Sequence, residues 1–165
     1  TIIQTQEEKV KQIAKKYKDA KTFFFLGRGI STATAYEGRL KLMEIAYVPA
    51  IAFPAGESKH GPISLVESGF PVIFICPKDE THKTLIGNIM EMKARGASII
   101  AVIEEGDEEV KALASDYVEV PRGIPDILSP IAYIIPLQLF AYYMAVERGL
   151  NPDMPKNLAK CVTVK

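Results

Sequence analysis

Two carboxylates and a lysine recur at helical spacing between residues 37 and 44. At about 100° per residue, Glu37, Lys41 and Glu44 fall within roughly 60° of one another around a helix. Apolar residues flank this charged stripe, with Tyr36, Leu40, Met43 and Tyr47 on one side and Leu42 and Ile45 on the other. An ordinary ion pair, contributing roughly 0.2–0.5 kcal/mol, would explain the spacing. A set of proton-transfer groups is the alternative, because a solvated helix normally has a broader polar face.

A histidine lies in a loop shortly after this helix. The loop, residues 54–62, carries Glu57, Lys59 and His60. A histidine titrates near neutrality, so it can move a proton to or from a sugar oxygen. Aldose–ketose isomerisation needs a carboxylate base, such an acid/base group and cations, because it removes a proton beside a carbonyl or imine and builds up enolate charge. Either carboxylate of the helix could be the base, with the lysine between them stabilising its ionised form.

The elements that must position these groups follow an alternating α/β pattern. Short apolar runs predict strands at Thr22–Leu26, Ala50–Phe53, Val72–Cys76, Ser98–Ile103 and Tyr117–Val120. Helical patterns lie near 4–19, 31–47, 60–67, 79–95, 107–114 and 129–148. The strongest runs are apolar at successive positions, which is typical of parallel strands buried on both faces. We therefore predict a three-layer α/β/α sandwich with a five-stranded parallel sheet in flavodoxin-like order.

Such sheets bind ligands at the carboxyl ends of their strands. The first loop, residues 27–32, leads into the helix of the charged stripe, and the second carries His60. Because the first two strands are expected to be neighbours, we expect the helix and the His60 loop to converge. Ser31 and Thr32, with Thr34, are candidate ligands for a small anion at the start of that helix.

The sequence disfavours several other kinds of site. The third glycine of the dinucleotide-binding fingerprint is replaced by Thr32, and the second strand ends without an acidic residue, which disfavours NAD. The third loop carries Asp79 and Glu80, which would repel a phosphate. His82 follows without an obvious partner and is expected at the surface. With no metal-ligand cluster and no P-loop, we expect neither a metal nor a cofactor.

Composition bounds the class of protein. With 165 residues, 48% of them hydrophobic, the chain is expected to form one domain with one core. Twenty basic and twenty acidic side chains cancel, so no net charge draws it to nucleic acid or to an anionic membrane. No apolar run is expected to reach the length of a membrane span. We interpret Cys76 and Cys161 as free thiols, with Cys76 in the core, which favours a cytoplasmic location.

The last residues, 149–165, form a separate segment. Gly149 can cap the preceding helix, and two prolines beyond it prevent continuation. The segment carries Lys156 and Lys160 with little predicted structure, which on its own indicates a frayed terminus. The helix before it, 129–148, is apolar nearly all round and must be covered by the sheet, a partner subunit or another domain.

Several motifs, in order, resemble those of one family. They read EGRLKLMEIAY and AFPAGESKHGPISL, then SPIAYIIPLQLFAYYMAVERG, and finally PDMPKNLAKCVTVK, within a similarity running from about residue 22 to the end. The chain is similar to the glucosamine-6-phosphate synthase family, and specifically to the second half of its carboxy-terminal isomerase region, a sugar isomerase (SIS) domain. This resemblance implies an enzyme that converts fructose 6-phosphate and glutamine-derived ammonia into glucosamine 6-phosphate.

The resemblance also implies roles for individual residues. Glu44 would move the proton between C1 and C2, supported by Glu37 and Lys41. His60 would assist sugar ring opening in the active site of a partner subunit, so a homodimer is expected. Lys160 would form a Schiff base with open-chain fructose 6-phosphate, which requires a tail that closes over the substrate. The implied substrate contacts are Ser31, Thr32 and Ala159.

These 165 residues hold only part of such an enzyme. They include neither a glutaminase domain with its amino-terminal cysteine nor the first SIS half with its phosphate loop. We therefore expect those parts as partners and expect the chain alone to be inactive. Lys156 stands where relatives often have arginine, so we assign it no specific contact. Two alternatives stay open: a stand-alone SIS isomerase or deaminase of amino-sugar phosphates, and a catalytically silent sugar-phosphate sensor.

Overall fold

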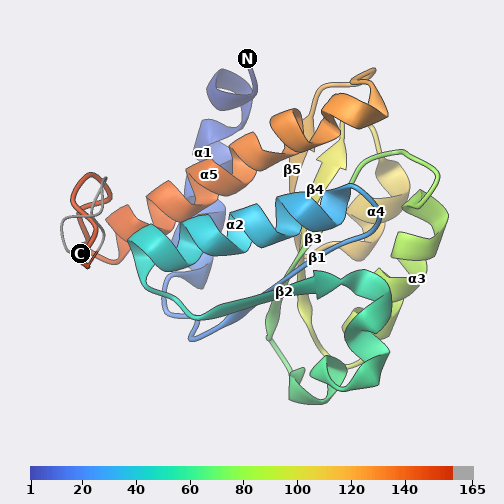
Figure 1. The fold of residues 1–165 in the computed structure, drawn as a ribbon, viewed down its shortest axis with the longest axis horizontal. Helices are drawn as coiled ribbons and strands as arrows, with labels where there is room; N and C mark the ends of the chain where they lie inside the picture. The colour runs from blue at the N-terminus through green and yellow to red at the C-terminus, as the bar shows by residue number, and fades with distance from the viewer. Residues whose placement is uncertain (158–165) are drawn as a thin grey trace, which may run out of the picture.

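Five strands form one parallel sheet with helices on both of its faces (Figure 1). The computed structural model describes residues 1–157. The strands are β1 (Phe23–Gly27), β2 (Ala50–Pro54), β3 (Pro71–Cys76), β4 (Ser98–Glu104) and β5 (Asp116–Val120). Their order in the sheet is β2-β1-β3-β4-β5, and every neighbouring pair is parallel. The predicted α/β/α sandwich and its flavodoxin-like order are therefore confirmed.

The helices divide between two hydrophobic layers. Helices α1 (Ile2–Tyr17), α2 (Ser31–Ala46) and α5 (Ser129–Glu147) cover one face, and α3 (His82–Lys93) and α4 (Glu108–Leu113) cover the other. Successive side chains of β1 alternate between the layers: Phe23 and Phe25 join the first, Phe24 and Leu26 the second. Each of these side chains is fully buried and stabilises the fold by roughly 1.5–3 kcal/mol, which explains why the strand is apolar at successive positions.

The expectation about membrane-length runs is wrong. The 3₁₀ turn η3 (Asp126–Leu128) and α5 together, Asp126–Glu147, are long and apolar enough to cross a membrane by length and composition, with a mean hydropathy of 1.5. Isolated polar residues and prolines interrupt this run without lowering its mean much, so counting uninterrupted apolar residues missed it. In the structure α5 packs against α1 and α2 as a core helix. Its buried apolar residues include Tyr133, Leu137, Phe140, Ala141 and Met144.

The segment after β2 also differs from prediction. In place of a helix near 60–67, the structure has two 3₁₀ turns, η1 (Ala55–His60) and η2 (Pro62–Leu65). Gly61 lies between them with a φ of +141°, and Pro62 has no N–H to donate. Helical hydrogen bonding therefore cannot run through this point, and His60 ends a short turn instead of beginning a helix.

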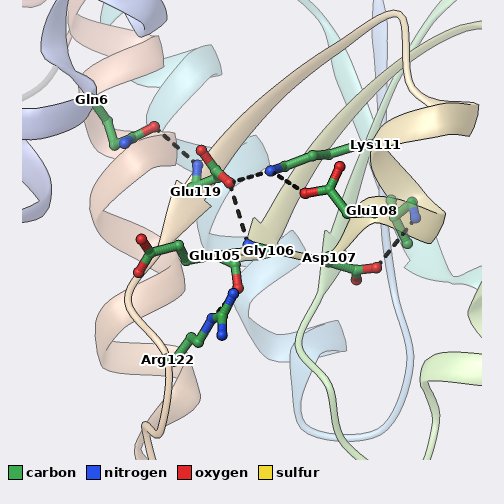
Figure 2. Close-up of polar contacts among 9 residues, drawn as sticks. Gln6, Glu105, Gly106, Asp107, Glu108, Lys111, Glu119 and Arg122 are labelled. Carbon is green, nitrogen blue, oxygen red and sulfur yellow. Dashed lines mark hydrogen bonds and ion pairs between the residues drawn. The ribbon is translucent and has the colours of Figure 1, made fainter.

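Ion pairs fasten the β4–β5 edge of the sheet (Figure 2). Lys111 Nζ lies 2.7 Å from Glu119 Oε1 in β5 and 2.8 Å from Glu108 Oε1 in α4. The backbone N–H of Glu119 donates to Gln6 Oε1 of α1 at 3.0 Å. Two carboxylates neutralise the lysine, one from α4 and one from β5. We therefore interpret this cluster as a structural contact that holds β5 to α4 and α1.

Helix α2 approaches α5 and β1 closely at Gly38. A Cβ atom on this glycine would lie 2.5 Å from Leu137 Cδ1 and 3.2 Å from Phe25 Cε1. The buried side of α2 also includes Ala35, Leu42 and Ala46. Burial of this side determines how the helix is rotated and leaves the charged stripe along its flank.

Replacing Gly38 by alanine is expected to lower the free energy of unfolding by about 1 kcal/mol, because overpacking of about 1–3 kcal/mol outweighs a helix-propensity gain of about 1 kcal/mol. Gly87→Ala is the matched control, because a Cβ there, on the exposed side of α3, meets nothing within 4 Å. That change should raise stability by about 0.5–1 kcal/mol. Urea denaturation followed by circular dichroism measures both, and equal stabilisation by the two substitutions would contradict the close approach at Gly38.

Candidate functional site

The charged stripe of α2 forms one cluster. Lys41 Nζ lies 2.7 Å from Glu44 Oε2 and 3.2 Å from Glu37 Oε1. The hydrogen bond to Glu44 raises the pKa of Lys41, and Glu37 adds to the rise. The structure thus brings together the three residues that helical spacing had grouped.

This cluster can offer a carboxylate to a substrate. The Lys41 and Glu44 side chains are about 30% exposed, and an ion pair at such a position contributes less than about 1 kcal/mol to stability. Lys41 engages one oxygen of Glu44, Oε2, which leaves Oε1 to accept a proton from a bound ligand. Exposed Tyr36, Leu40 and Met43 of the same helix form an apolar stripe beside the cluster. The arrangement therefore suits a carboxylate base at the edge of a surface that another protein element can cover.

The His60 loop is held on the α3 side of the sheet. Lys59 Nζ lies 2.7 Å from Glu91 Oε1 of α3. Arg28, at the end of β1, donates to Oδ1 of the buried Asn88 at 3.2 Å, and Asn88 donates to Glu91 at 3.3 Å. His60 itself is exposed at the end of η1. A chain of polar contacts from β1 through α3 therefore positions the loop and leaves the imidazole facing solvent.

The helix and the His60 loop do not converge within one chain. Gly27 pairs with Pro54 across β1 and β2, so both connections start at the same edge of the sheet. From there α2 runs over the face that holds α1 and α5, whereas η1 turns towards α3. Within residues 1–157 no hydrogen bond or ion pair joins the α2 cluster to His60. The carboxylates and the histidine of one chain therefore lie on segments that pack on different faces of the sheet.

The hydroxyl groups at the start of α2 are largely enclosed. Ser31 and Thr34 are buried, and in the described part of the chain their hydroxyl oxygens have no hydrogen-bond partner. Thr32 is half-buried, and its hydroxyl donates to the Gly27 carbonyl oxygen at 3.4 Å. Of the two hydroxyl residues expected to contact substrate, Thr32 is thus the accessible one.

His82 is not the surface residue that the sequence suggested. Its Nε2 lies 2.6 Å from Asp107 Oδ2, and the two side chains are 13% and 1% exposed. Asp107 also accepts from the Val110 N–H at 3.2 Å as the N-cap of α4. The pair joins the start of α3 to the start of α4, and the prediction failed because the partner lies 25 residues away in another loop.

Cys76, at the end of β3, is buried as predicted, and burial raises the pKa of its thiol. Across residues 1–157, no group of three or more histidine, cysteine or acidic side chains is arranged to hold a metal ion.

The tail returns from α5 to the end of α2. Gly149, with a φ of +70°, follows α5, and Leu150 packs against the core of the first layer. Further along, the Lys156 N–H donates to Tyr47 Oη at 2.6 Å, a contact that the sequence did not suggest. Ala159, Lys160 and Cys161 lie outside the described residues, so what the sequence implies for them stays a prediction.

The residues that support the His60 loop were missed by sequence reasoning. Asn88 carried a usable signal, because it is a polar residue inside the apolar helical stretch LIGNIM, and buried polar groups need partners. Glu91 carried none, since a charged residue one turn later on a half-exposed helix is ordinary.

Glu91→Gln should loosen the His60 loop in a pH-dependent way. The hydrogen bond from Lys59 lowers the pKa of Glu91 below its usual 4.5. The ion pair therefore stabilises the fold above that pH and is lost as pH falls through the lower folded value. We expect the variant to lose about 0.5 kcal/mol at pH 7 and less at pH 3, because the carboxylate is protonated as pH falls through its lowered pKa.

Urea denaturation at the two pH values measures this difference, with the exposed Glu109→Gln on α4 as control. Equal losses for Glu91→Gln at both pH values would contradict an ionic contact with Lys59.

Comparison of the sequence and the structure with known proteins identifies the family of this chain. Residues 16–148 match the SIS domain. The chain is 46% identical, over 96% of its length, to the isomerizing glutamine–fructose-6-phosphate aminotransferase of Methanothermobacter thermautotrophicus, and 49% identical over 94% to that of Thermus thermophilus. It spans only 27% and 26% of those proteins. A solved carboxy-terminal domain of glucosamine-fructose-6-phosphate aminotransferase from Francisella tularensis aligns with a TM-score of 0.83 and 34% identity, covering 92% of this chain and 42% of that one. The resemblance found in the motifs is confirmed, and the chain belongs to the SIS domain family.

Proposed function

We propose that this chain is the second SIS half of an isomerizing glutamine–fructose-6-phosphate aminotransferase. The observation that carries the proposal is the 46–49% identity to relatives of that name over 94–96% of the chain. The chain spans about a quarter of those relatives, so it would act together with a first SIS half and a glutaminase domain. The reaction converts fructose 6-phosphate and ammonia from glutamine into glucosamine 6-phosphate.

Glu44 is the proposed base of the isomerisation. It takes a proton from C1 of the fructose 6-phosphate imine, and the C–H electrons form a C1–C2 double bond while the imine nitrogen gains a proton. Return of a proton to C2 and loss of the O1 proton then give the 2-amino aldehyde. Lys41, 2.7 Å from Glu44 and 3.2 Å from Glu37, holds the carboxylate in place and keeps a cation beside the developing enolate charge.

Lys160 and His60 would prepare the substrate for this step. His60 exchanges a proton with the ring oxygen as the sugar opens. The Lys160 amine then adds to the C2 ketone, loss of water leaves a Schiff base, and ammonia displaces the lysine to give the imine. The proposed substrate contacts remain Ser31, Thr32 and Ala159. At the start of α2, Thr32 is more accessible than the buried Ser31.

We propose that the chain acts in a homodimer, in which His60 completes the site of the other subunit. His60 lies in a loop packed towards α3, and no described contact joins it to the Glu44 cluster of its own chain, so we propose that it enters the site of a partner subunit. The exposed apolar stripe of Tyr36, Leu40 and Met43 supports association of α2 with another domain or subunit, because apolar patches of this kind mark interaction surfaces. The buried thiol of Cys76 suits a reducing compartment, and we propose a cytoplasmic location.

The direct test compares the 165-residue chain with the full-length protein that contains it. Glucosamine 6-phosphate formation from fructose 6-phosphate is measured with glutamine and, separately, with ammonium as the nitrogen donor. We expect turnover by the full-length protein and none by the isolated chain, because the first SIS half is needed to complete the site. Robust turnover by the isolated chain with ammonium would contradict the division of labour and favour a stand-alone isomerase or deaminase.

A further inference from the structure

The described part of the tail docks on the last turn of α2. Tyr47 Oη accepts a hydrogen bond from the Lys156 N–H at 2.6 Å, and Lys156 Nζ lies 5.6 Å from the centre of the Tyr47 ring. Upstream, the Asp153 N–H donates to Asn151 Oδ1 at 3.0 Å, which forms a local turn. Leu150 packs against the core, so the segment 150–156 is held at its start by Leu150 and at its end by the contact between Lys156 and Tyr47.

The backbone of Tyr47 is unusual for a bulky residue. It follows α2 as the C-cap in the left-handed conformation, with φ +55° and ψ +34°. Glycine adopts this conformation at helix ends with less strain than any other residue. A tyrosine in such a conformation points to a role for its side chain, and its hydroxyl group and ring both contact Lys156.

We propose that Tyr47 is a positioning residue that docks the tail and thereby sets where the chain departs towards Lys160. This inference rests on the proposed function, which makes Lys160 the Schiff-base lysine. Four residues separate Lys156 from Lys160, and an extended chain of that length spans about 13–14 Å. Glu44 lies three residues before Tyr47, a rise of about 4.5 Å along the helix axis. The chain beyond the docked Lys156 is therefore long enough for Lys160 to reach the Glu44 cluster.

The hydroxyl group is the part of Tyr47 that can be tested in isolation. Tyr47→Phe removes the acceptor for the Lys156 N–H and keeps the ring under the lysine cation. Loss of one such hydrogen bond should speed hydrogen exchange of the Lys156 amide about fivefold. Tyr142→Phe is the matched control, because Tyr142 is an exposed tyrosine on α5, away from the tail contact.

Two measurements test the proposal. Amide exchange in the 165-residue chain reports on docking, with the melting temperature of each variant checked in parallel. In the full-length enzyme, borohydride reduction in the presence of fructose 6-phosphate converts the imine on Lys160 to a stable secondary amine, and mass spectrometry gives its rate of formation. We expect Tyr47→Phe to speed exchange and to slow trapping by similar factors at an unchanged melting temperature, and Tyr142→Phe to match the wild type.

Equal exchange at Lys156 in the wild type and in Tyr47→Phe would overturn tail docking. Faster exchange with unaltered trapping would overturn the positioning role. A wild-type enzyme that yields no adduct on Lys160 would refute the lysine's assignment in the proposed function, whereas exchange at Lys156 decides docking by itself.

Discussion

Helix α2 can lie close to α5 and β1 because Gly38 has no side chain where Leu137 and Phe25 pack. This contact determines the rotation of the helix about its axis, since the side that carries Gly38 must face the core. Glu37, Lys41 and Glu44 consequently lie along one flank, between the buried side and the exposed apolar stripe. The close approach at one glycine thus determines where the candidate base is presented.

The same topology separates the parts of the proposed site. β1 and β2 end level, but α2 and η1 leave that edge towards opposite layers. The polar chain from Arg28 through Asn88 and Glu91 to Lys59 then holds the His60 loop against α3. His60 is exposed in this loop, and no hydrogen bond or ion pair among the described residues joins it to the carboxylates of its own chain, which agrees with the proposal of a site shared between subunits. The described end of the tail is docked at Tyr47, directly after the helix that carries the carboxylates.

Features governed by local patterns could be predicted from the sequence. The apolar runs identified all five strands. They are clearest in β1, β3 and β4, which are buried on both faces and are therefore apolar at successive positions, and weaker in the partly exposed edge strand β5. Helical spacing grouped Glu37, Lys41 and Glu44, because residues three and four apart share a helix face. Features that depend on distant partners could not be predicted. The pairs His82–Asp107 and Lys59–Glu91 each join different loops or helices, and no local pattern relates their members. The helix expected at 60–67 is interrupted at Gly61, which has a φ of +141°, and at Pro62, which has no N–H to donate, so here a local signal was available.

Glu44 is proposed to move the proton between C1 and C2, and isotope transfer from a labelled substrate tests this role. Fructose 6-phosphate deuterated at C1 is given to the full-length enzyme and to its Glu44→Gln variant, and label at C1 and C2 is followed by NMR while borohydride trapping monitors Lys160. We predict that the wild type removes deuterium from C1 during turnover. The variant should form the trapped adduct and retain the label at C1. Loss of the label at the wild-type rate in Glu44→Gln would contradict the account.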